Sequence, residues 1–161
     1  MEACPPGIVH YVGFGQYEGG HDAVQLDGSP DEQFEYLRDV DFARCFGEVA
    51  PRLVVLQPYK VSDTEVPVDF TTLAPALLDI GVQAVVAFPL PVDLDVSYVF
   101  FKAFYTQIMA GVSLRAAVQA GRLELENWSR PWAFPAVMAS YPGDIYLASQ
   151  QSVSGGPGVK P

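Results

Sequence analysis

The chain has 161 residues and a formal net charge of −10 at pH 7. Its composition, 50% hydrophobic and 12% aromatic, excludes a disordered chain and fits one globular domain. The charge disfavours nucleic acid as a partner, because the sequence offers no basic stripe to neutralise phosphates. The two cysteines, Cys4 and Cys45, lack the spacing of a zinc site. We therefore expect no metal, no cofactor and no disulfide framework.

The sequence also argues against a membrane location. Residues 96–111 are largely apolar, but they include Lys102 and Gln107 and fall short of the roughly 20 apolar residues that a membrane span needs. The first residues lack the basic region and apolar core of a secretory leader. We therefore expect a cytoplasmic protein that does not contact a membrane.

In chain order, strand patterns alternate with helix patterns, which predicts an α/β fold with helices on both faces of a mostly parallel sheet. Continuous apolar runs at residues 8–12, 53–56 and 82–88 predict central or near-central strands. Between the first two, residues 17–28 read as a loop with a short hairpin. Asp41 is then expected to cap a short helix that buries Cys45 as a small apolar side chain.

Capping residues outline the later helices. Thr72 is the expected N-cap of a helix over residues 73–80, which Gly81 ends in a left-handed conformation. Asp93 or Asp95 is expected to cap the next helix, and Ser113 the one after it. A last strand is predicted at residues 133–140, where a proline pushes it to an edge of the sheet, and a disordered tail follows from residue 149.

The order of these elements resembles the CHAT domain, a caspase-like module found with tetratricopeptide repeats in bacterial proteins. The resemblance covers residues 7–147, and its longest part is the helix, glycine and strand run at residues 73–87. The remaining matches follow in the family's order and spacing: Val12-Gly13-Phe14-Gly15, Leu53 to Tyr59, Pro91-Val92-Asp93, Phe101 to Tyr105, Gly111, Ala117, Gly121-Arg122 and Trp132. It implies a three-layer caspase-like domain over residues 1–148.

The resemblance also implies where catalytic residues would stand. In the family, a His-Gly pair ends the first strand and a Cys ends the second, whereas this chain has Phe14 and Tyr59 at those positions. No catalytic residue is therefore assigned. The strand ends are instead expected to form a binding surface, made of Gly13, Phe14, Gly15, Gln57, Pro58 and Tyr59.

A caspase-like domain normally has two strands and two helices before the strand that carries its His. This chain begins only a few residues before that strand, so its sheet should lack the first strands of the fold. The outer edge of the strand at residues 8–12 should then be open, or paired with another segment. The expected partner is another protein or the remainder of a larger chain.

Three functions stay open. The first is an inactive caspase-like module that acts as an interaction or regulatory domain in a bacterial signalling or defence protein. The second is a cysteine peptidase with a displaced dyad, in which His10 or His21 works with Cys45. The third is a small-molecule-binding α/β domain, because a fold alone does not determine a function. His10 lies about 13 Å along the strand from the expected site, which favours a structural role.

Overall fold

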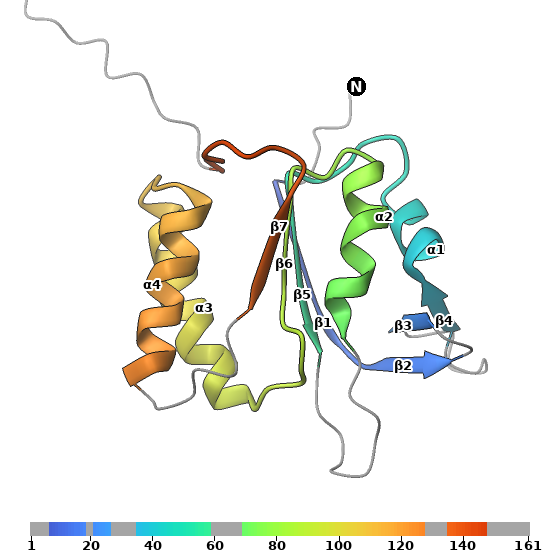
Figure 1. The fold of residues 1–161 in the computed structure, drawn as a ribbon, viewed down its shortest axis with the longest axis horizontal. Helices are drawn as coiled ribbons and strands as arrows, with labels where there is room; N and C mark the ends of the chain where they lie inside the picture. Colours follow the sequence, from blue (N-terminus) through green and yellow to red (C-terminus); the bar gives the residue numbers. More distant parts are fainter. Residues whose placement is uncertain (1–6, 19–20, 27–34, 59–68, 128–134, 148–161) are drawn as a thin grey trace, which may run out of the picture.

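The computed structural model describes residues 7–18, 21–26, 35–58, 69–127 and 135–147. It is a three-layer α/β structure whose main sheet has four strands in the order β1-β5-β6-β7 (Figure 1). These strands are β1 (Ile8–Gly13), β5 (Leu53–Pro58), β6 (Ala84–Ala87) and β7 (Ala136–Ala139). The first three run parallel and β7 is antiparallel, so the predicted mostly parallel sheet is confirmed.

Strands β5 and β6 form the middle of the sheet because both of their faces are buried. Every residue of Leu53–Leu56 and Ala84–Ala87 is fully buried. Alternate side chains enter two separate cores: Leu53 and Val55 belong to one, while Val54 and Leu56 belong to the other. A strand buried on both faces reads as an unbroken apolar run, which is the signal in the sequence.

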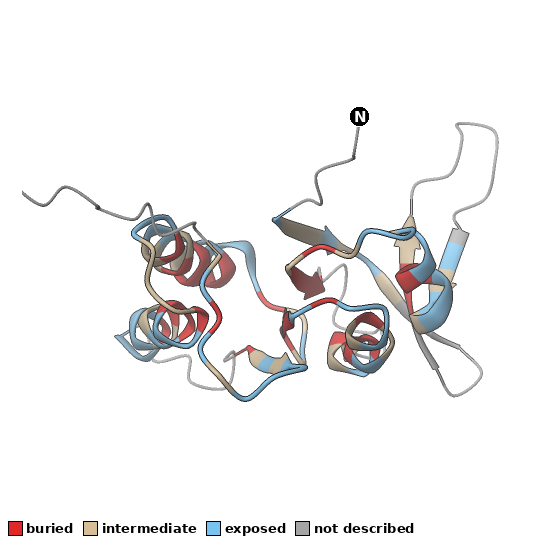
Figure 2. Ribbon diagram, turned by 90° about the horizontal axis from the view of Figure 1, so that it is seen from above, coloured by how far each residue is buried: buried red, intermediate tan, exposed pale blue. Residues whose placement is uncertain are grey.

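Each core is closed by its own helical layer (Figure 2). One face of the sheet is covered by α1 (Asp39–Arg44), the 3-10 helix η1 (Phe70–Leu73) and α2 (Ala74–Asp79). The other face is covered by α3 (Leu94–Met109) and α4 (Leu114–Asn127). Side chains from opposite layers therefore meet different surfaces of the sheet.

Strand β1 lies at an edge of the main sheet, next to β5. The sequence placed it at or near the centre, and that part of the prediction is wrong. The expectation that its outer edge is open fits this position, because the described residues place no strand on that side. Val12, on this strand, is 50% exposed.

A second sheet follows β1 where the sequence predicted mostly loop. It is antiparallel, with the order β2-β3-β4, and comprises β2 (Gly15–Glu18), β3 (His21–Leu26) and β4 (Glu35–Arg38). The hairpin expected within residues 17–28 is thus one part of a larger structure. Its buried residues Ala23 and Val24 reach the side of the main sheet covered by α1 and α2.

Two of the predicted helix caps, Thr72 and Asp41, are wrong. Asp69 caps η1: its carboxylate accepts a hydrogen bond from the Thr71 backbone N–H at 2.9 Å, while Thr72 lies within that helix. Asp41 lies inside α1 and pairs with Arg44. The other two predicted caps are confirmed by position: Asp93 is the N-cap of α3, although without a side-chain hydrogen bond, and Ser113 precedes α4, where its Oγ accepts from the Ala116 N–H at 3.4 Å.

Helices α3 and α4 pack closely through a glycine. A Cβ atom placed on Gly121 would lie 2.5 Å from two carbons of the Phe100 ring. That ring is fully buried among the rings of Phe88, Phe101 and Phe104. The close approach of the two helices therefore requires a residue without a side chain at position 121.

The described chain enters and leaves the domain at one end of the sheet. The Leu53 N–H donates to the Gly7 carbonyl at 3.1 Å, and Arg52 Nη1 donates to the Leu147 carbonyl at 3.2 Å. Within the described residues, no helix is long and apolar enough to cross a membrane. The tail predicted from residue 149 lies outside them.

Candidate functional site

The candidate site lies at the carboxyl ends of β1 and β5. Their register pairs Val12 with Gln57 and Gly13 with Pro58, so both strands end at one edge of the sheet. This is the juxtaposition that the binding-surface prediction requires. Gly13 has no room for a side chain, because an added Cβ would collide with the Tyr11 ring.

Phe14 follows β1, and its backbone is held in place by neighbouring strands. Its carbonyl accepts a hydrogen bond from the Gln25 N–H at 2.9 Å, and the Tyr11 hydroxyl lies 2.9 Å from the same oxygen. The Tyr11 hydroxyl is also 2.6 Å from the Gln25 carbonyl. Phe14 as a residue is 36% exposed, so it contributes apolar surface at this edge. A phenyl ring cannot accept a proton.

His10 lies deeper, in the middle of β1, and faces α3. Its ring packs against Phe101, with the ring centres 4.4 Å apart, and its Nδ1 is 2.9 Å from the Tyr105 hydroxyl. Burial lowers the pKa of His10, and the neighbouring Gln57 side chain opposes this shift. The buried Nε2 nevertheless has no partner of hydrogen-bonding geometry among the described residues. The imidazole is therefore a half-buried group whose lowered pKa favours the neutral form.

Tyr105 is the partner of His10 that the sequence did not identify. It was expected only as part of an aromatic core, although it lies four residues after Phe101 and so on the same face of α3. Burial raises the pKa of its phenol to about 12. At neutral pH the hydroxyl keeps its proton, so it can donate a hydrogen bond to Nδ1 of His10.

Cys45 is exposed, although the sequence predicted a buried thiol. It is the C-cap residue of α1, where its side chain points away from the core and its Sγ lies 3.4 Å from the Asp41 carbonyl. His10 faces the α3 layer, whereas α1 covers the opposite face of the sheet. A dyad of His10 and Cys45 would have to act through the sheet.

Some of the predicted residues lie outside the described part of the chain. These are Tyr59, Cys4 and the side chain of His21, so the predicted contact between Phe14 and Tyr59 stays a prediction. Among the residues that are described, no group of three or more His, Cys, Asp or Glu side chains could hold a metal ion. Of the predicted binding residues that are described, Gln57 and Pro58 are buried, so Phe14 supplies the exposed apolar surface of this edge, with the half-buried imidazole of His10 behind it.

Comparison with known proteins agrees with this fold. None of the curated proteins matches the chain. The family model for the CHAT domain matches residues 1–142, which include the main sheet and both helical layers. The chain therefore belongs to the CHAT domain family.

Proposed function

We propose that this chain is a CHAT domain without peptidase activity that works by binding protein, as an interaction or regulatory module of a bacterial signalling or defence protein. The observation that carries the proposal is the placement of two residues: Phe14, which follows β1, and His10, which lies within it. Phe14 stands where a caspase-like peptidase has its His, and the imidazole that is present, His10, is half-buried against α3.

Peptidase chemistry needs a thiolate and an imidazole within hydrogen-bonding reach of each other. His10 already has its Nδ1 engaged by Tyr105, and its Nε2 is buried away from substrate. Cys45 lies on the other side of the sheet. These positions support an inactive domain over a displaced dyad of His10 and Cys45.

The edge of β1 supports the binding role. Since the Gly7 carbonyl accepts from the Leu53 N–H, strand alternation turns the polar groups of Val9 and Tyr11 toward β5 and those of His10 and Val12 outward. An open strand edge is a template for pairing with another chain. An added strand would lie beside Phe14, so backbone pairing and ring contact could act together.

Peptidase activity can be tested on the full chain with peptides that carry basic or acidic residues at the cleaved position. No turnover above buffer is expected. Cys45→Ala is the matched control, and Cys4→Ala reports on the second thiol. Turnover that is lost in either variant would show a working nucleophile and end the proposal of inactivity.

The binding edge can be tested by amide hydrogen exchange. In the dilute chain, the amides of Val9 and Tyr11 should be protected by β5, whereas those of His10 and Val12 should exchange quickly. A partner that pairs with β1 should protect His10 and Val12 selectively. Strong protection of these two amides in a monomer would mean that the edge is covered within the chain, and the binding role would have to be abandoned for this surface.

A further inference from the structure

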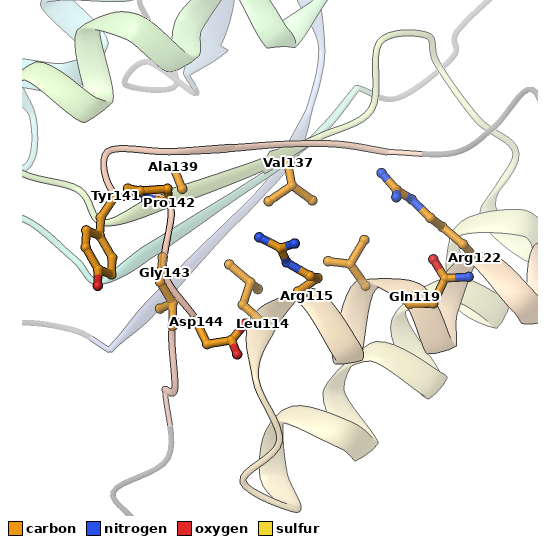
Figure 3. A pocket seen from close by; sticks show the side chains of 12 residues that line it. Leu114, Arg115, Gln119, Arg122, Val137, Ala139, Tyr141, Pro142, Gly143 and Asp144 are labelled. Atoms are coloured by element: carbon orange, nitrogen blue, oxygen red, sulfur yellow. The ribbon is translucent and has the colours of Figure 1, made fainter.

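A cavity of about 550 Å³ lies between α4, β7 and residues 141–145, away from the edge that carries Phe14 (Figure 3). Its size is within the range of small-ligand sites, roughly 300–1,000 Å³. Arg115 and Arg122 extend from α4 toward β7, and Val137 points from β7 toward α4 (Figure 3). The cavity therefore has a basic wall and an apolar floor.

The floor exists because α4 does not close over the end of the sheet. Met138 packs into the core on the α1 and α2 side, whereas Val137 and Ala139 face the α4 side. Val137 is 37% exposed, although β5 and β6 are fully buried on the same face. Helices α3 and α4 cover this face on β5 and β6, whereas on β7 the apolar surface at Val137 is left open.

The basic wall is one face of α4. Arg115, Gln119 and Arg122 are spaced by four and three residues, which places them on one side of the helix. Seven residues of helix separate the two arginines by about 10 Å along its axis. Two guanidinium groups therefore border one cavity from end to end.

These arginines are not neutralised by the described part of the protein. Arg122 donates from Nη2 to the Pro135 carbonyl at 2.7 Å, while its buried Nε has no hydrogen-bond partner among the described residues. Arg115 has no hydrogen bond or ion pair to any of them. Among the described residues, Asp144 is the one carboxylate that lines the cavity, and it forms no ion pair with either arginine.

Such an arrangement is unexpected in a chain with 19 acidic and 9 basic residues. The overall charge repels anions, so only local contacts can hold one here. The planar guanidinium group matches a carboxylate through two parallel hydrogen bonds. We propose that this cavity binds a carboxylate-bearing ligand with an apolar body, the acid held by Arg115 and the body lying against Val118 and Val137.

The same chemistry can come from a free organic acid or from acidic side chains of an extended polypeptide. Suberate, with two carboxylates on an unbranched hydrocarbon chain, represents the first. The peptide acetyl-Glu-Val-Glu-Val-amide represents the second, and its Gln counterpart removes only the charges. Titration followed by NMR of the full chain should shift backbone amides of α4 and β7, with Val137 among them, and should leave those of β1 unchanged.

Two variants should change the affinity in opposite directions. Arg115→Ala should weaken binding about tenfold or more, because it removes a charged hydrogen-bond donor. Asp144→Asn should tighten binding about two- to fivefold, since it removes an exposed like charge. Arg44→Ala, an exposed arginine in the opposite helical layer, is the matched control and should bind as the unchanged protein does.

Each outcome decides the matter. Binding of suberate alone with the Arg115 dependence identifies a free acid as the ligand, and binding of the Glu peptide alone identifies an acidic polypeptide segment. If neither probe shifts α4 and β7 amides at millimolar concentration, the cavity is not an acid site. The proposal also fails if Arg115→Ala binds as well as Arg44→Ala while circular dichroism shows both variants folded.

Discussion

Replacing Gly121 with alanine tests the close packing of α3 and α4, because two effects of known sign oppose each other. In an open helix, alanine is more favourable than glycine by about 1 kcal/mol. Here the new methyl group would lie 2.5 Å from the Phe100 ring. Carbon atoms in ordinary contact are about 3.5–4.0 Å apart, so the ring or the helix must move by about 1 Å.

Phe100 has little freedom to make that movement. Its ring centre lies 5.4 Å from that of Phe88, 5.1 Å from Phe101 and 5.6 Å from Phe104. Overpacking a core of this kind typically costs about 1–3 kcal/mol. After the helix gain is subtracted, we expect Gly121→Ala to lower the free energy of unfolding by up to about 2 kcal/mol. The midpoint of thermal unfolding should fall by up to about 8 °C.

A second substitution separates the two effects. In a Phe100→Leu background the ring is absent, so Gly121→Ala should be neutral or stabilising by up to about 1 kcal/mol. Urea and thermal unfolding followed by circular dichroism would measure the unchanged protein, the two single variants and the double variant. A higher unfolding midpoint for Gly121→Ala in the otherwise unchanged protein would refute the close approach of the two helices.

Three further predictions concern single side chains. Because burial lowers the pKa of His10 from 6.5, the unfolded state takes up a proton first, so stability should fall as the pH drops below about 6.5; urea unfolding should show a smaller drop between pH 7.5 and 5.5 for His10→Phe than for the control His21→Gln. Arg52→Ala should cost about 1–3 kcal/mol in chemical unfolding, since Arg52 donates to the carbonyls of Tyr146 and Leu147; an unchanged midpoint would show that these bonds contribute nothing. Tyr11→Phe should cost about 0.5–1.5 kcal/mol in the same assay by removing the hydroxyl at the Phe14 and Gln25 carbonyls, and should speed amide exchange at Gln25.

The main sheet could be predicted because its central strands carry an unmistakable pattern. Strands β5 and β6 are buried on both faces, and such strands read as unbroken apolar runs. The second sheet lacked this signal. Strand β2 consists of Gly15, Gln16, Tyr17 and Glu18, a mixture that fits a loop as well as a strand. Its pairing depends on contacts with β3 that the local sequence does not reveal.

Local capping signals were less reliable: they were right at Asp93 and Ser113 and wrong at Thr72 and Asp41. Asp69 and Thr72 both precede α2, and the carboxylate of Asp69 reaches the Thr71 N–H from outside the helix. Cys45 was expected to be buried because thiols usually are, yet it falls one residue beyond α1, where the chain turns to solvent. Which residue caps a helix, and whether a residue near its end is buried, therefore depends on where the helix begins and ends within the fold.

The two candidate sites differ in how far sequence reasoning could reach them. The edge beyond Gly13 was predicted, because parallel strands end at a common edge and the family resemblance marks those ends. The cavity beside α4 was not. The seven-residue spacing of Arg115 and Arg122 was not singled out in the sequence, and the exposed floor comes from β7, whose position requires the three-dimensional structure.

The hydrogen bonds from Arg52 and Leu53 to Leu147 and Gly7 bring both connections of the domain to one corner. Strand β1 has six residues, so this corner lies about 20 Å from Phe14. Any chain that continues from Gly7 or Leu147 would therefore be attached at the end of the sheet opposite Phe14, and would leave the Phe14 edge accessible. A biotin or fluorophore tethered at that corner would leave the opposite edge free, which makes surface immobilisation a suitable format for measuring its partners.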